Sequence, residues 1–158
     1  MKISLLSVGR PRGAIAEVIE LYEKRIPHYF SWETVEVREA AGRGLTAAQV
    51  MQDEGARLLA RLSGAGKVIA LDRLGTMWSS ERLANWLDES AVRGVPGATF
   101  IIGGAFGLSP AVLERVDEKI SFSPMTFPHE VARLLLVEQL YRAGTILRGE
   151  PYHKGKGS

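Results

Sequence analysis

The chain has 158 residues, of which 46% are hydrophobic and 24% are charged. These proportions and this length are typical of one globular domain with a normal core, so they exclude extensive disorder. The chain contains no cysteine, which excludes disulfides, thiolate metal sites, iron–sulfur clusters and cysteine nucleophiles. The formal net charge of +2 is mildly basic and by itself excludes no class of enzyme.

The apolar run near the N-terminus is too short for a signal peptide, and no small-residue cleavage site follows it. No segment approaches the length of a membrane span. The absence of cysteine also fits a reducing compartment. We therefore expect a soluble cytoplasmic protein that has no membrane partner.

The first part of the chain predicts a strand, a helix and a second strand. Residues 3–8 form a short apolar run, which predicts a buried strand. Apolar residues at helical spacing from Ile15 to Tyr22 predict a helix that ends at Pro27. Residues 33–37 alternate polar and apolar, so we expect a half-exposed strand near a sheet edge.

The middle of the chain continues the alternation with a helix, a strand and another helix. Thr46 and Gln49 have the spacing of a capping box and predict the start of a helix. Residues 67–71 predict a buried strand that ends at Asp72. Ser79 is then expected to cap a helix that carries Trp86 on its apolar face.

The C-terminal part contains the most apolar strand, residues 98–102, which we expect at the centre of the sheet. Ser109 and Pro110 suit the cap and first turn of a short helix. Residues 120–123 predict the last strand and residues 131–147 the last helix. Regular alternation of strands and helices predicts a single α/β domain over residues 1–158, with a mostly parallel sheet flanked by helices.

Three irregular segments follow three of these strands, and parallel strands gather such ends at one ligand-binding edge. They are Leu71-Asp72, the glycine loop 103–107 and the proline-containing loop 123–128. The glycines match neither a dinucleotide nor a P-loop spacing, so taken alone they favour a strand-to-helix turn that needs positive φ over a phosphate-binding loop. The prolines favour a rigid loop that offers backbone groups to a planar base. Together the three segments predict a ligand pocket.

The histidines are too scattered to indicate a metal site, and we predict none. His28 is expected at the surface. His129 either caps the last helix or lines the pocket. His153 lies between Tyr152 and Lys154 in a terminal tail, where a structural role is least expected.

Basic residues gather in the last quarter of the chain, which fits either a nucleic-acid partner or a solvated helix face. Combined with the loops, these residues resemble the RlmH family, the bacterial ribosomal RNA large-subunit methyltransferases H of the SPOUT class. The resemblance extends over essentially the whole chain. The matching motifs are Leu71-Asp72, Ile102-Gly103-Gly104-x-x-Gly107-Leu108, Ser121-x-Ser123-x-Met125-Thr126-Phe127-Pro128-His129, Glu138-Gln139-x-Tyr141-Arg142-Ala143 and Pro151-Tyr152-His153-Lys154.

The resemblance implies a SPOUT-type fold with a deep C-terminal trefoil knot over about residues 68–150 and a functional tail over 151–158. It implies a homodimer that uses S-adenosylmethionine (AdoMet) without a metal. The implied substrate is the N3 atom of a pseudouridine in a 23S rRNA stem-loop, within the assembled ribosome. Residues 155–158 extend past the usual end of the family.

The resemblance also assigns roles by position. Catalysis falls to Arg142, Tyr152 and His153, with His153 or Tyr152 as the candidate acceptor of the N3 proton. RNA contacts fall to Arg142, Lys154 and His129. AdoMet binding is assigned to Leu71, Asp72, Gly103, Gly104, Ser123, Pro124, Met125, Thr126, Phe127 and Pro128. Two alternatives remain open: a non-enzymatic nucleotide- or RNA-binding α/β module, and a SPOUT methyltransferase that acts on another RNA.

Overall fold

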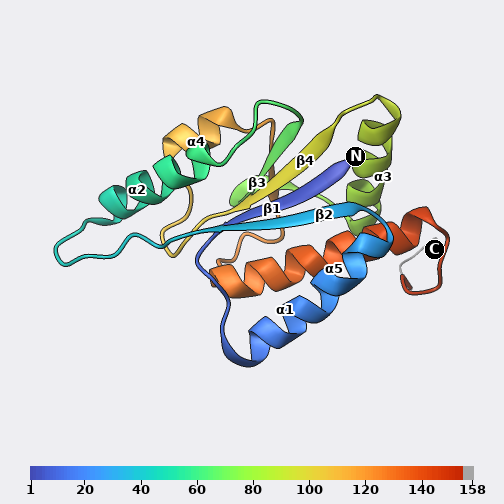
Figure 1. The fold of residues 1–158 in the computed structure, drawn as a ribbon, viewed down its shortest axis with the longest axis horizontal. Coiled ribbons are helices and arrows are strands. Elements are labelled where there is room, and N and C mark those ends of the chain that lie inside the picture. Colours follow the sequence, from blue (N-terminus) through green and yellow to red (C-terminus); the bar gives the residue numbers. More distant parts are fainter. Residues whose placement is uncertain (155–158) are drawn as a thin grey trace.

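A computed structural model describes residues 1–154, so the predicted extension at residues 155–158 lies outside the described residues. Strands and helices alternate through this part of the chain (Figure 1). None of its helices is both long and apolar enough to cross a membrane. The elements are β1 (Lys2–Val8), α1 (Gly13–Arg25), the 3₁₀ turn η1 (Ile26–His28), β2 (Ser31–Val37), α2 (Ala47–Ala60), β3 (Lys67–Met77), α3 (Ser80–Val92), β4 (Gly97–Ile102), α4 (Pro110–Arg115), β5 (Glu118–Ser121) and α5 (His129–Leu147).

The strands form one sheet in the order β2-β1-β4-β3-β5. Every neighbouring pair is parallel, which confirms and strengthens the prediction of a mostly parallel α/β sheet. β4 occupies the centre and β2 an edge, as their apolar and alternating patterns predicted. Since all strands run the same way, all their carboxyl ends lie along one edge of the sheet.

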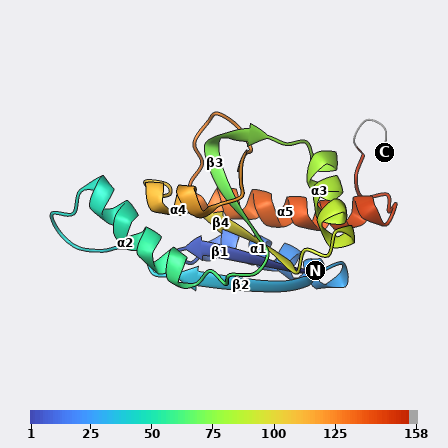
Figure 2. The ribbon, with the colours of Figure 1, turned by 90° about the horizontal axis from the view of Figure 1, so that it is seen from above.

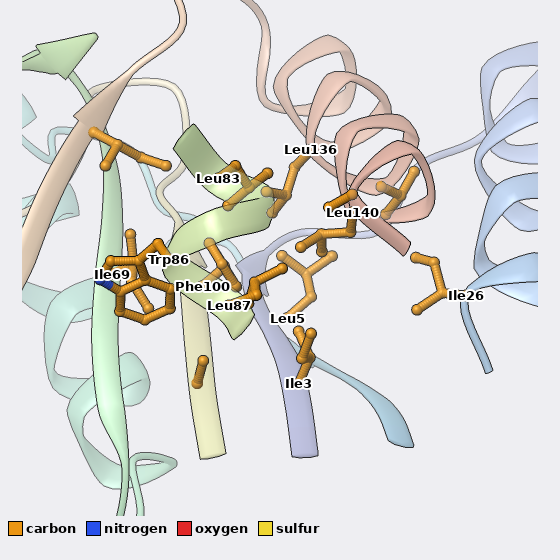
Figure 3. Packing of buried hydrophobic residues seen from close by; sticks show 14 of the residues in the cluster. Ile3, Leu5, Ile26, Ile69, Leu83, Trp86, Leu87, Phe100, Leu136 and Leu140 are labelled. Carbon is orange, nitrogen blue, oxygen red and sulfur yellow. The ribbon is translucent and has the colours of Figure 1, made fainter. Parts of the chain in front are cut away.

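Helices cover both faces of the sheet, as Figures 1 and 2 show. On one face, α1, α3 and α5 pack over the strands, and Leu136 and Leu140 of α5 approach Leu5 and Phe100 (Figure 3). On the other face, α2 and α4 enclose a second core around Ile101. Burial on both sides explains why the central strands read as uninterrupted apolar runs.

Local capping signals place the helix starts correctly. The hydroxyl of Thr46 accepts a hydrogen bond from the Gln49 amide, and the Gln49 side chain accepts one from the Thr46 amide, so the predicted capping box is confirmed. The Ser79 hydroxyl caps α3 by accepting a hydrogen bond from the Arg82 amide, and the Ser109 hydroxyl caps α4 by accepting one from the Val112 amide. These contacts satisfy amides that the first helical turn leaves free.

Several element boundaries differ from the sequence prediction. β3 does not end at Asp72 but resumes after a bulge and continues to Met77, with Leu71 and Thr76 both opposite Ile120 of β5. The polar bulge hid this second half, because it interrupts the apolar run. β5 begins at Glu118 and ends at Ser121, earlier than the predicted range 120–123. α5 starts at His129, directly after Pro128, rather than at residue 131.

The replacement Gly144→Ala tests the packing of α5 against η1 and the residue that follows it. A Cβ atom at Gly144 would overlap the ring of Tyr29. Overpacking costs about 1–3 kcal/mol, more than the gain in helix propensity of about 1 kcal/mol that alanine offers. We expect denaturant unfolding to show a lower free energy of unfolding. Gly64→Ala, at a site with open space around it, should leave that free energy unchanged. Equal stability of all three proteins would contradict the close contact with Tyr29.

Candidate active site

A cavity of about 320 Å³ opens at the carboxyl ends of β3, β4 and β5, a volume that suits a small-molecule ligand. Most of the residues predicted to bind AdoMet line it. They are Leu71, Asp72, Gly103, Gly104, Ser123, Met125, Thr126 and Phe127. Pro124 and Pro128 are not part of the lining; Pro128 precedes the first turn of α5. The lining also includes apolar residues that sequence reasoning did not select: Ile102, Leu108, Leu113, Ile120 and Phe122.

The glycine loop turns back on itself at the mouth of this cavity. The Gly107 amide donates a hydrogen bond to the Gly104 carbonyl at 3.1 Å. Gly107 has a φ of +85°, in the left-handed region that favours glycine. A Cβ atom at Gly103 would lie 2.9 Å from the Gly107 carbonyl carbon. The loop therefore needs glycine to close, and its closed form presents backbone rather than side chains to the cavity.

The loop that follows β5 is held in place by serine hydroxyls. Ser121 is buried, and its hydroxyl oxygen accepts a hydrogen bond from the Ser123 amide at 3.1 Å. The same oxygen lies 3.1 Å from the Arg73 carbonyl in the β3 bulge. The Ser123 hydroxyl in turn accepts from the Met125 amide at 3.1 Å. Ser121 thus connects two walls of the cavity.

His129 lines the cavity and does not cap α5. The helix has no side-chain cap, and His129 Nε2 lies 3.6 Å from Oε1 of Glu39, which follows β2. Of the two roles that the sequence left open for His129, the structure therefore places it in the pocket lining. His28 is exposed, as expected.

The tail residue Tyr152 packs against the C-terminal half of α5. Its ring meets the ring of Tyr141 edge-on, with 4.7 Å between centroids. Its hydroxyl donates to Glu138 Oε1 at 3.1 Å and lies 3.5 Å from the Tyr22 hydroxyl. Burial, with help from the hydrogen bonds to Tyr22 and Glu138, raises the pKa of Tyr152. In this arrangement Tyr152 stays a phenol, which makes it a poor proton acceptor.

His153 has partners on both ring nitrogens. Arg142 Nη1 donates to Nδ1 at 3.0 Å, since a guanidinium only donates. Nε2 therefore carries the ring proton and donates to Glu81 Oε1 on α3 at 2.8 Å. This hydrogen bond is the main cause that lowers the pKa of Glu81. The His153 side chain is only 9% exposed, so the tail has structural contacts that its terminal position did not predict.

Arg142 and Lys154, both predicted to contact RNA, differ in exposure. The guanidinium of Arg142 donates twice to Glu138 Oε1, at 2.6 and 3.0 Å, and this bond raises the pKa of Arg142. Lys154 is exposed. Sequence reasoning missed the roles of Glu81 and Glu138. Glu138 precedes Arg142 by one helical turn, a recognisable pairing distance, whereas Glu81 is far away in the sequence.

The structure does not bring the tail to the cavity of the same chain. The cavity touches α5 at His129 and Ala132, whereas the tail contacts Glu138 and Arg142. Ala132 and Arg142 are separated by about 15 Å along the helix axis, at 1.5 Å per residue. The predicted catalytic residues and the predicted donor residues thus form two separate clusters within one chain.

The chain has an all-parallel sheet, a glycine loop and a cavity at the carboxyl ends of its strands. Comparison with known proteins indicates a class that agrees with this architecture. A family model described as predicted SPOUT methyltransferase matches residues 1–153. The fold is also similar to that of a probable methylase family protein from Haemophilus influenzae, with a TM-score of 0.51 and 14% sequence identity. That likeness covers 99% of this chain and 71% of the other, and it concerns the fold alone.

Relatives with higher sequence identity show to which family within this class the chain belongs. The ribosomal RNA large subunit methyltransferase H of Gemmatimonas aurantiaca is 48% identical over 155 residues, which cover 98% of this chain and 100% of the relative. The protein of the same name from Rubrobacter xylanophilus is 47% identical, with 96% and 98% covered. The chain therefore belongs to the ribosomal RNA large subunit methyltransferase H family of SPOUT methyltransferases, and the resemblance seen in its motifs is confirmed.

The replacement Arg142→Ala is expected to release the tail from α5. It removes the donors to Glu138 and His153 and a guanidinium that lies 4.9 Å from the Tyr152 ring centroid. Hydrogen bonds to charged groups contribute about 1.5–3 kcal/mol, so amide exchange in the tail should accelerate about tenfold or more. Hydrogen-exchange mass spectrometry measures this. Arg115→Ala, on α4 at the opposite face, is the matched control. Unchanged exchange in the Arg142 variant would contradict the docked tail.

Proposed function

We propose that this chain is an AdoMet-dependent methyltransferase that modifies N3 of a pseudouridine in a 23S rRNA stem-loop of the assembled ribosome. The observation that carries the proposal is one cavity lined by most of the expected donor-binding residues, in a chain that belongs to this family. Relatives that match nearly the full chain are called ribosomal RNA large subunit methyltransferases, which supports the choice of RNA. Such a substrate would place the enzyme in the cytoplasm.

The cavity residues fit AdoMet. Leu71, Ile102 and Phe122 offer apolar contacts suited to an adenine ring, and the closed glycine loop exposes backbone groups for the polar parts of the ligand. The loop over residues 123–127 is fixed by the hydroxyls of Ser121 and Ser123. AdoMet supplies an electrophilic methyl group on a sulfonium. The task of these residues is to hold that group in line with the acceptor.

The reaction breaks the bond from sulfur to the methyl carbon, forms a bond from that carbon to N3, and releases the N3 proton. It requires no metal. Alignment of donor and acceptor can lower the barrier by about 7–11 kcal/mol at best. The proton needs an acceptor, and Tyr152 is unsuitable as a phenol with a raised pKa. We infer that Arg142 turns from His153 to an RNA phosphate, which frees Nδ1 of His153 to accept the proton.

We propose that the enzyme works as a two-fold homodimer in which the tail of one chain faces the donor cavity of its partner. The two clusters are about 15 Å apart along α5, so one chain alone does not assemble the site. Large apolar side chains also lie exposed near the cavity mouth: Leu74 is 77% exposed, Phe106 55% and Met125 73%. Apolar surface of this kind favours contact with another protein surface. Lys154 and His129 would then approach the RNA from two chains.

We further propose that the chain is knotted over about residues 68–150. Two observations support a tight crossing there. β5 pairs with β3 on both sides of the bulge. A Cβ atom at Gly75, in that bulge, would lie 2.6 Å from the Lys119 carbonyl carbon, so the two backbones touch. Of the predicted functional tail over 151–158, only residues 151–154 belong to the described part.

The replacement Gly104→Val is expected to abolish donor binding, because its Cβ atom would lie 2.6 Å from Oε1 of the buried Glu54 and would force the glycine loop, which lines the cavity, out of position. Calorimetric titration with AdoMet in the presence of a chelator measures binding. Mass mapping of rRNA from a deletion strain tests the modification, which the wild-type gene should restore and Gly104→Val should not. Gly64→Val is the control. Restoration of the methyl group by a protein that binds no AdoMet would overturn the proposed function.

Mixing two inactive variants tests the shared site. Gly104→Val lacks a donor cavity and His153→Ala lacks the tail imidazole, so each homodimer should fail to methylate ribosomes. In a random mixture, half of the dimers would combine one intact cavity with the intact tail of the partner. About a quarter of the wild-type activity should then return. Light scattering and melting curves confirm that both variants are folded dimers. No recovery after subunit exchange would contradict a site built from two chains.

A further inference from the structure

Glu54 is a buried carboxyl group that the mechanism above does not use. It lies in the middle of α2 and is 3% exposed. Its Oε2 atom accepts a hydrogen bond from the Ala40 amide at 3.1 Å. Its Oε1 atom is also buried and has no hydrogen-bond partner among residues 1–154. Acidic side chains are rarely buried without partners, because the loss of hydration is costly. A buried Oε1 atom without a hydrogen-bond partner in the described part of the chain is therefore unusual, and a functional role would explain it.

Glu54 lies directly behind the glycine loop of the donor cavity. A Cβ atom at Gly104 would be 2.6 Å from Oε1 of Glu54. Gly104 itself lines the cavity. The carboxyl group therefore contacts a residue that lines the cavity, so its charge lies close to any ligand bound there.

Other charged groups around Glu54 do not neutralise it. Arg57, one turn further on α2, donates to the Arg38 carbonyl at 2.8 Å. His129, at the start of α5, lies 3.6 Å from Glu39. Burial raises the pKa of Glu54 and Glu39 adds to that effect, whereas the Ala40 hydrogen bond, Arg57 and His129 oppose it. The balance leaves a carboxyl group that a nearby positive charge would stabilise in its ionised form.

We propose that Glu54 makes the cavity selective for charge, so that it favours the cationic methyl donor over the neutral product. This inference rests on the proposed function. When the methyl group leaves, the sulfonium of AdoMet becomes the neutral thioether of S-adenosylhomocysteine. A carboxylate behind Gly104 attracts the first and not the second, because Coulomb interactions act through the protein interior without contact. Since this attraction stabilises the bound donor, it aids exchange of product for donor and does not accelerate transfer itself.

Calorimetry with AdoMet and S-adenosylhomocysteine tests the proposal in the wild type and in Glu54→Gln. At mildly alkaline pH, the ratio of the product Kd to the donor Kd should be about tenfold higher in the wild type, the order expected for one charge at this depth. The two proteins should converge at acidic pH, where Glu54 is protonated. Glu39→Gln, which removes a neighbouring carboxylate that is 60% exposed, should keep the wild-type ratio. Equal ratios in wild type and Glu54→Gln would overturn the inference.

A second measurement does not depend on ligand binding by Glu54→Gln. In the wild type, at a pH between the acidic and mildly alkaline conditions, where Glu54 is partly protonated, titrations in two buffers of different ionisation enthalpy should show proton release with AdoMet that exceeds the release with S-adenosylhomocysteine. Equal release would also overturn the inference. If the wild type binds no AdoMet, the proposed function fails; if it binds both ligands without charge selectivity, only the role of Glu54 fails.

The ligand-free proteins test the buried carboxyl directly. A pKa raised above the usual 4.5 means that the folded state holds the proton more tightly than the unfolded state. The stability of the wild type should therefore fall as pH rises above that value, relative to Glu54→Gln. Denaturant unfolding should show a stability advantage of Glu54→Gln that grows with pH. An advantage that stays constant with pH would contradict the buried, titrating carboxyl on which the inference depends.

Discussion

The contact between the β3 bulge and the backbone of β5 determines the shape of the cavity at the carboxyl ends of β3, β4 and β5. Gly75 approaches the Lys119 backbone so closely that no side chain fits between them. Pairing on both sides of the bulge then directs residues 72–75 away from the sheet. Ser121 joins this bulge to the loop after β5 through the Arg73 carbonyl. Two of the three cavity walls therefore depend on one close contact between two paired strands.

α5 sets the distance between this cavity and the tail. Its orientation is held by Arg133, whose side chain is 6% exposed and whose guanidinium pairs with Glu23 of α1 at 2.9 Å and Glu36 of β2 at 2.6 Å. Removal of one member of a buried ion pair leaves an uncompensated charge, so such a cluster tolerates little change in geometry. A rigid helix with the cavity near one end and the tail near the other explains why we infer a site shared by two chains.

The hydrogen bonds that hold the tail in place use the same ring nitrogens of His153 that the proposed proton transfer needs. Arg142, His153 and Glu81 form a chain of hydrogen bonds that fixes the imidazole and occupies both of its nitrogens. An ordered tail avoids the entropy cost of assembling the site anew with each substrate. In the mechanism that we propose, the imidazole becomes reactive only when Arg142 leaves it, which would couple substrate binding to proton transfer.

Sequence alone determined the features that depend on neighbouring residues. The capping box at Thr46, the cap at Ser79 and the central strand at residues 98–102 follow from local hydrogen bonds and apolar runs. The cavity could be anticipated too, since parallel strands place their carboxyl ends at one edge. Most of the residues that the family motifs assigned to the donor line that cavity.

Only the tertiary structure decided which distant groups meet. His153 and Glu81 are 72 positions apart, and no periodic pattern connects residues at such a separation. Glu54 reads as a polar residue on an amphipathic helix, yet the packing of α2 against the glycine loop buries it behind Gly104. The β3 bulge likewise depends on pairing with a strand that follows much later. Local propensity determines each element, whereas contacts between elements depend on how the whole chain packs.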